Sequence, residues 1–200
     1  MVTTRRAAAS IAILAVLLPC VGVTQTRPAT VALPAQFHVQ VWGETGTAFT
    51  NRIDNYYDLR ARVQHQLPAV AVTDSVGQIR RSTRALATAI RVARPGAVQG
   101  EFFTAATGTE FKRVIALITT VGVCAAIMDD NPRAFTHAID GSYPSGKSLA
   151  TMPGIILARL PPLPNDIEFR FVGRHLILYD VRANTIIDRL PYAIECHSRY

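Results

Sequence analysis

The amino-acid sequence predicts an α+β domain in which about three helices pack on a small antiparallel C-terminal meander. Apolar residues recur at the 3.6-residue spacing of helices between residues 51 and 122, and at the two-residue spacing of strands after residue 166. Helices followed by a run of strands are typical of α+β proteins. The 200 residues are 49% hydrophobic and 18% charged, the composition of a globular chain. We therefore expect a single domain, residues 49–200.

The first 23 residues have the three parts of a secretory signal peptide. MVTTRR is a short basic region, residues 7–18 form an apolar core, and small residues follow Pro19. We expect cleavage and export to the periplasm or the extracellular space. Two alternatives would keep the protein at a membrane: an uncleaved apolar anchor, or acylation of Cys20, although Pro19 stands where the lipobox requires a small residue.

Three helices are expected after the leader. Residues 24–48 contain two prolines and two glycines and predict a flexible linker. The first helix is expected from Asn51 to Pro68, and the second after the N-cap residue Asp74 until Pro95. A third should start near Phe102 and end at Gly122. Their apolar stripes include Ile53, Tyr56, Leu59, Val63, Ile79, Leu86, Ile90, Phe111, Ile115 and Ile118.

The period changes in the C-terminal part. Residues 134–140 are a candidate strand and residues 153–159 a short helix. Gly173-Arg174 is a two-residue hairpin turn that places Phe171 opposite Leu176 and Phe169 opposite Leu178. Residues 185–188 predict a further strand after the turn at residues 182–184.

The cysteines predict one disulfide. If Cys20 leaves with the leader, Cys124 and Cys196 remain, and two thiols in an oxidising compartment often form a bridge. The alternative is a buried free cysteine and a second free cysteine near the terminus. The five histidines show no ligand spacing, so we expect no metal site and no cofactor.

GSYPSGKS matches the phosphate-loop pattern G-x-x-x-x-G-K-[ST] at Gly141, Gly146, Lys147 and Ser148. A working loop follows a buried strand and opens a helix, because backbone N–H groups, helix N-terminus and lysine must converge on the phosphates. The preceding AFTHAID is half polar, and Pro153 would break a long helix. We interpret the stretch as a surface turn. A small nucleotide-binding or hydrolytic enzyme that uses this loop with Asp180 is the alternative.

A second arrangement for chemistry is an acid/base group at the end of the meander. Asp180 and Asp188 could meet there, with His175 and Tyr179 nearby. Aspartates at strand ends more often cap turns, so we name no catalytic residue.

Basic residues exceed acidic ones. The formal net charge is +7, or +5 without Arg5 and Arg6 of the leader. Arg80, Arg81 and Arg84 lie together on the second expected helix, either as a weak anion-binding surface or as a solvated face. No aromatic stacking platform accompanies them, so we do not expect nucleic acid as a partner.

Several segments resemble a group of uncharacterised exported bacterial proteins of unknown function. YPSGKSLATMP, LPPLP and FRFVGRHLILYDVRANTIIDRLP resemble their C-terminal portion, and NYYDLRARVQHQLP with GEFFTAATGTEFKRVI resembles their helical portion. The resemblance implies export and one domain, and it carries no activity, cofactor or catalytic residue. We expect a non-enzymatic module of the periplasm or envelope. It would bind a partner, such as an envelope protein, through the hairpin's polar face and edge strand or through the arginine-bearing helix.

Overall fold

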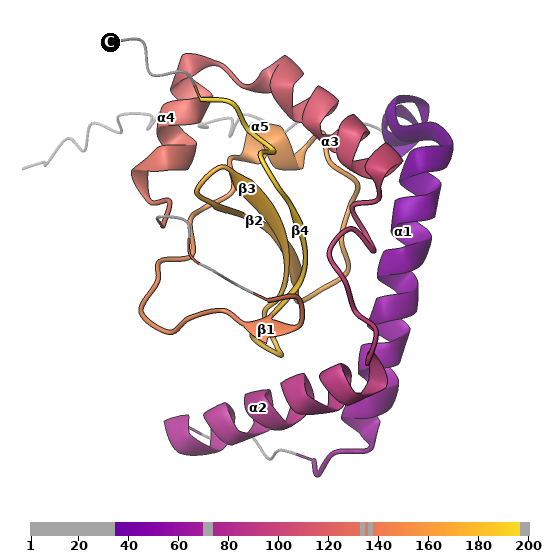
Figure 1. The fold of residues 1–200 in the computed structure, drawn as a ribbon, viewed down its shortest axis with the longest axis vertical. Coiled ribbons are helices and arrows are strands. Elements are labelled where there is room, and N and C mark those ends of the chain that lie inside the picture. Colours follow the sequence, from indigo (N-terminus) through magenta and orange to yellow (C-terminus); the bar gives the residue numbers. More distant parts are fainter. Residues whose placement is uncertain (1–34, 70–73, 133–134, 136–137, 197–200) are drawn as a thin grey trace, which may run out of the picture. The chain divides into compact units, whose positions relative to one another are not determined.

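The computed structural model describes residues 35–69, 74–132, 135 and 138–196, with backbone alone for residues 35–41. These residues form five helices and a four-stranded antiparallel sheet (Figure 1). The predicted α+β class is therefore confirmed. The signal peptide, Cys20 and residues 24–34 of the expected linker lie outside the described residues.

Helix α1 (Ala35–His65) starts well before the expected Asn51, so residues 35–48 are helical where a flexible linker was expected. The apolar stripe continues toward the N-terminus, because Trp42 and Phe49 are buried in the same core as Ile53. Gly43 has the non-helical angles φ 49° and ψ −140°, so two helical segments meet at a kink there. The glycine was misread as a linker signal.

Helix α2 (Val76–Ala93) begins one residue later than predicted. The hydroxyl of Ser75, not Asp74, accepts the backbone N–H of Gln78 as the N-cap. Leu86, Ala87 and Ile90 are buried in the C-terminal half of the helix, which therefore anchors it to the domain.

The third expected helix is two helices, α3 (Ala105–Ile118) and α4 (Val121–Asp129). Gly122 lies in the first turn of α4 and does not end α3, which corrects the prediction. The break falls at Thr119-Thr120, where the Thr120 hydroxyl accepts the N–H of Val123. None of the described helices is by itself long and apolar enough to cross a membrane; α3 and α4 reach that length only together, and they are bent by 111°.

The sheet has the order β1-β4-β3-β2. The hairpin of β2 (Ile167–Val172) and β3 (His175–Asp180) has the predicted register, with Phe171 opposite Leu176 and Phe169 opposite Leu178. Strand β4 (Thr185–Leu190) pairs with β3 through a bulge at Leu178/Tyr179. The expected strand at 134–140 lies partly outside the described residues; residues 138–140 form no strand, and the two-residue β1 (Gly141–Ser142) follows them.

The helices and the sheet share one main core. Phe49 of α1, Phe111 of α3 and Phe169 of β2 pack with ring centroids 5.0 to 6.1 Å apart. Helix α5 (Gly154–Leu157), the short helix predicted after Pro153, adds the fully buried Ile156. The second face of the sheet carries a smaller cluster of Tyr143, Val172, Ile177, Tyr179 and Ile186.

The two cysteines meet as predicted. Cys124 of α4 and Cys196 lie at disulfide distance, with sulfurs 2.23 Å and Cα atoms 5.6 Å apart. The pair links the end of the described chain to the helical half of the domain.

Candidate anion-binding groove

The acid/base site that the sequence offered at the end of the meander does not form, because His175 and Asp180 lie at opposite ends of β3. Asp180 is fully buried and accepts hydrogen bonds from Tyr56 Oη at 2.9 Å and Arg60 Nη1 at 3.3 Å. Burial raises the pKa of Tyr56, and the charge of Asp180 raises it further. His175 lies at the other end of β3, paired with Val172 beside the hairpin turn. Asp180 therefore connects α1 to the sheet.

Asp188 has a structural role of its own. Its buried carboxylate accepts the backbone N–H groups of Gly100, Phe102 and Phe103 at 2.8 to 2.9 Å. These bonds attach the loop between α2 and α3 to β4. The sequence around Asp188 does not predict these hydrogen bonds, because the donors are backbone N–H groups far away in the chain. Gly100, for example, is 88 positions from Asp188.

Asp140 holds the C-terminal end of α2 against the start of β1. Its left-handed backbone (φ 56°) places a buried carboxylate against Arg94, which also pairs with Glu101 at 2.6 Å. Arg91 donates to the backbone carbonyl of Asp140 at 3.3 Å. Burial raises the pKa of Asp140, and the guanidinium of Arg94 opposes that rise.

The stretch that matches the phosphate loop forms a strand and a turn. Gly141 and Ser142 are β1, and residues 143–153 contain no helix. Tyr143 Oη donates to the carbonyl of Ser148 at 2.7 Å, and Ser148 Oγ donates to the carbonyl of Asp130 at 2.9 Å. Lys147 is exposed. The strand-to-helix geometry that would bring N–H groups and lysine to one phosphate is absent from these residues.

A groove runs between α2 and the start of this stretch. Its main cavity, of about 530 Å³, lies between the arginine-bearing side of α2 and residues 142–145; the helix contributes Ile79, Arg80, Thr83, Arg84 and Ala87. A second cavity of about 470 Å³ shares Ile79 and Thr83 with it and extends to Val181, Arg182 and the end of α1. The arginine helix and the glycine-rich turn, two separate weak signals in the sequence, thus face each other across one groove. Lys147 is not among the lining residues.

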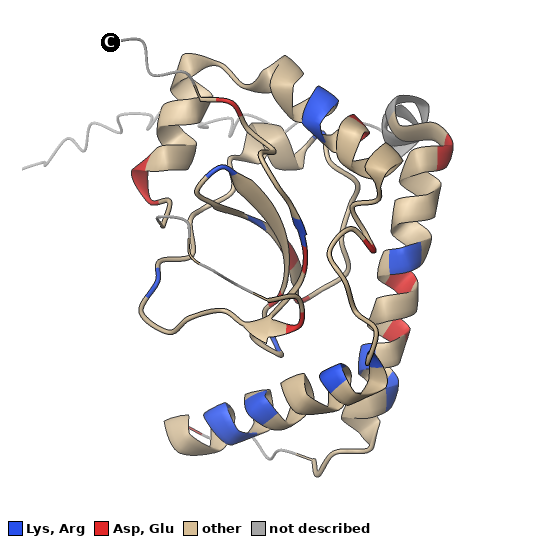
Figure 2. Ribbon diagram, viewed as in Figure 1, with Lys and Arg blue, Asp and Glu red and all other residues tan. Residues whose placement is uncertain are grey.

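The groove is positively charged because α2 has arginines and no acidic residue. In Figure 2 this helix shows basic residues alone. Arg80 and Arg84 are exposed and have no hydrogen-bond or ion-pair partner among the described residues. By contrast, Arg60, Arg94 and Arg170 are each paired with a carboxylate.

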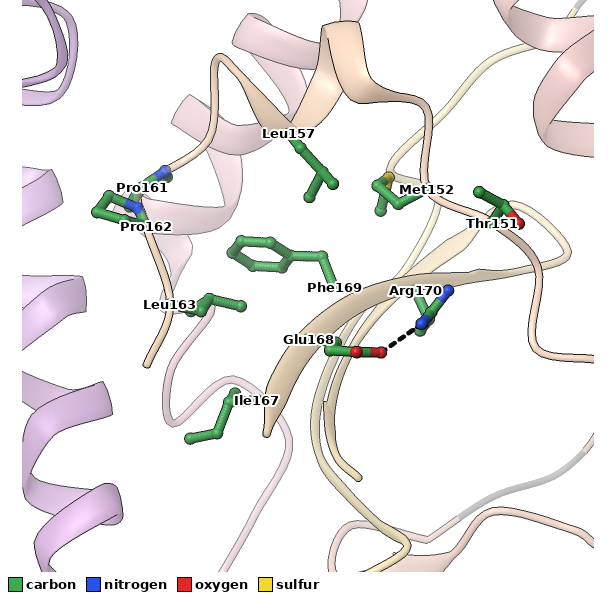
Figure 3. Close-up of a pocket in the computed structure, with 10 residues that line it drawn as sticks. All are labelled: Thr151, Met152, Leu157, Pro161, Pro162, Leu163, Ile167, Glu168, Phe169 and Arg170. Carbon is green, nitrogen blue, oxygen red and sulfur yellow. Dashed lines mark hydrogen bonds and ion pairs between the residues drawn. The ribbon is translucent and has the colours of Figure 1, made fainter. Parts of the chain in front are cut away.

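A third cavity, of about 500 Å³, lies beside the edge strand β2 (Figure 3). Its walls are mainly apolar, and Phe169 projects between Leu157 and Leu163. Its two charged side chains, Glu168 and Arg170, form an ion pair with each other, so their charges cancel. Arg170 also donates to the carbonyl of Ala150 at 2.9 Å. This cavity therefore offers no unpaired charge for recognition.

Nothing in the described part of the chain resembles a metal centre: no three histidine, cysteine, aspartate or glutamate side chains are grouped there. No protein family, curated protein or solved structure matches this chain. The resemblance to exported bacterial proteins therefore stays a prediction, and function has to be argued from the groove.

Proposed function

We propose that this protein is an exported, non-enzymatic binding module of the periplasm or envelope, and that it holds an anionic partner in the groove between α2 and residues 142–145. The observation that carries the proposal is the pair of exposed arginines, Arg80 and Arg84, which line the groove without a carboxylate partner in the described chain.

Such a groove favours anions for two reasons. Two like charges one helical turn apart repel each other weakly, and an anion bound between them removes that repulsion. A concave site with charge of one sign also concentrates the field and raises the association rate of oppositely charged ligands. Guanidinium groups add paired, directional donors that suit carboxylates and phosphates.

The lining supports binding more than chemistry. Neither cavity of the groove is lined by histidine, cysteine, aspartate or glutamate, so the serine and threonine hydroxyls that line it have no histidine or carboxylate beside them to act as a general base. Three buried carboxylates nearby, Asp140, Asp180 and Asp188, are engaged in holding elements together.

Export is supported by the Cys124–Cys196 pair, because disulfides persist in oxidising compartments. Fractionation of the native cell, followed by intact mass under non-reducing conditions, tests it. We expect a processed chain outside the cytoplasm that is lighter by two hydrogens than its free-thiol form. A cytoplasmic chain that keeps Met1 or Val2 would contradict export.

Binding is tested by titrating labelled anionic probes (polyglutamate, a heparin oligosaccharide, polyphosphate) into the protein. We expect at least one to bind in a salt-dependent manner, and Arg80→Gln with Arg84→Gln to weaken it at least tenfold. A matched control is Arg62→Gln with Lys112→Gln, which removes the same charge from α1 and α3. If both double variants weaken probe binding equally, binding depends on the net charge of the protein and not on the groove.

A further inference from the structure

We infer that the partner in this groove is an extended acidic peptide segment that carries carboxylates at alternate positions and lies between α2 and the β1 edge of the sheet. The inference rests on the proposed function and specifies its ligand.

The spacing of the arginines matches an extended chain. Arg80 and Arg84 are four positions apart on α2 and therefore about 6 Å apart along one side of the helix. Side chains two positions apart on an extended strand lie on the same side with a separation of roughly 6.6 Å. Two alternate glutamates can thus face the two guanidinium groups in register.

The groove is lined by apolar side chains as well as by arginines, so a ligand with both apolar and anionic groups fits it best. Ile79 lies in both cavities and is 48% exposed. Pro144 and Ala183 line the main cavity with it. A peptide whose apolar side chains alternate with its carboxylates covers this surface, and each apolar CH₂ removed from water favours the complex. Polyphosphates and sulfated sugars have no comparable apolar group.

The opposite wall adds polar side chains. Strand β1 is the outer strand of the sheet in the described chain; because the N–H of Gly141 already donates to the carbonyl of Ala138 at 3.0 Å, this wall contributes side chains and not strand pairing. Ser142 and Ser145 are exposed on this wall and offer hydroxyl groups.

The length of the site sets the length of the ligand. The lining residues of α2 run from Ile79 to Ala87, about 12 Å along the helix axis. An extended chain covers that length with about four residues. A seven-residue peptide is therefore long enough to fill the groove and continue beyond it at both ends.

The test uses the mature, disulfide-bonded protein and two fluorescein-labelled peptides of identical composition: the alternating peptide TEVEVET and the block peptide TEEVVET, which has no two glutamates at alternate positions. Fluorescence anisotropy measures their affinity, with inorganic tripolyphosphate as a competitor. We expect the alternating peptide to bind at least fivefold more tightly than the block peptide. Arg80→Gln and Arg84→Gln should each weaken it about fivefold, while Arg62→Gln changes it less than twofold.

The outcomes separate the inference from the function it rests on. Equal affinity for both peptides, or tighter binding of tripolyphosphate with the same dependence on Arg80 and Arg84, would overturn the inference that the ligand is an alternating acidic peptide. The proposal that the groove binds anions would still stand. If neither arginine affects any of the three probes, the proposed function falls together with the inference. Circular dichroism of each variant excludes loss of α2 as the cause.

Discussion

At the scale of single residues, buried carboxylates decide how the elements of this domain are held together. Asp140, Asp180 and Asp188 are at most 3% exposed, and each joins segments far apart in the sequence. A buried charge is stable where it is paired and hydrogen-bonded, and each of the three has arginine or backbone donors. Pattern reading from the sequence placed Asp180 and Asp188 near strand ends but could not find their partners, because the partners come from α1 and from a loop.

Replacing Asp188 by alanine should destabilise the domain strongly. Three backbone N–H groups would lose their acceptor while remaining largely buried, and each unsatisfied group costs roughly 1–3 kcal/mol. We expect the free energy of unfolding in urea to fall by at least about 3 kcal/mol. Asp54→Ala, an exposed change on α1, is the control and should alter stability by less than about 0.5 kcal/mol. Similar small losses in both variants would contradict the role of Asp188.

Asp140 should make stability depend on pH in an unusual direction. Burial raises its folded-state pKa above the ordinary 3.8, so the folded state binds this proton more tightly than the unfolded state. Its contribution to the free energy of unfolding therefore increases as pH falls through the folded-state pKa toward 3.8 and is lost as pH rises again.

Comparison with Asp140→Asn isolates that contribution, because asparagine tolerates the left-handed backbone and does not titrate. We expect urea unfolding to show the wild type gaining stability relative to Asp140→Asn between pH 7 and pH 4. A gap between the two proteins that stays constant, or that moves the other way, would count against a raised pKa.

At the scale of elements, the sequence predicts best what local chemistry determines. The β2–β3 hairpin has the expected register because Gly173-Arg174 fixes the turn and the alternation fixes the faces. The predicted helix ends were wrong where helical residues and buried side chains continue past a glycine. Gly43 separates two helical segments of α1 at a kink and does not open a linker, and Trp42 and Phe49 are buried on either side of it. Gly122 lies inside a helix capped by Thr120.

The link between α4 and the C-terminal segment should be an important source of stability. Cys124 and Cys196 are 72 positions apart, and closing a loop of that length contributes about 4 kcal/mol in the chain-entropy account. We expect a reductant to lower the urea midpoint of the wild type and to leave that of Cys124→Ser with Cys196→Ser unchanged. A wild type that is indifferent to reductant would show that the pair contributes nothing.

At the scale of the whole domain, the candidate site arises from tertiary structure. Arg80 and Arg84 of α2 are more than fifty positions from the GSYPSGKS stretch, and the sequence alone offers each as a separate surface feature. The contacts of Asp140 with Arg91 and Arg94 join the end of α2 to the start of β1, and that junction places residues 142–145 opposite Arg80 and Arg84. The residue types of the groove could be found in the sequence; their opposition across a cavity could not.

Binding of a peptide in the groove is seen residue by residue in a ¹⁵N–¹H correlation spectrum recorded during titration with the alternating acidic peptide. We predict that the largest backbone amide shifts fall on residues 79–87 and on Ser142, Tyr143 and Ser145, and that they disappear in the Arg80→Gln, Arg84→Gln double variant. Shifts centred on α3, on α4 or on Lys147, or shifts that persist in the double variant, would contradict binding in the groove between α2 and residues 142–145.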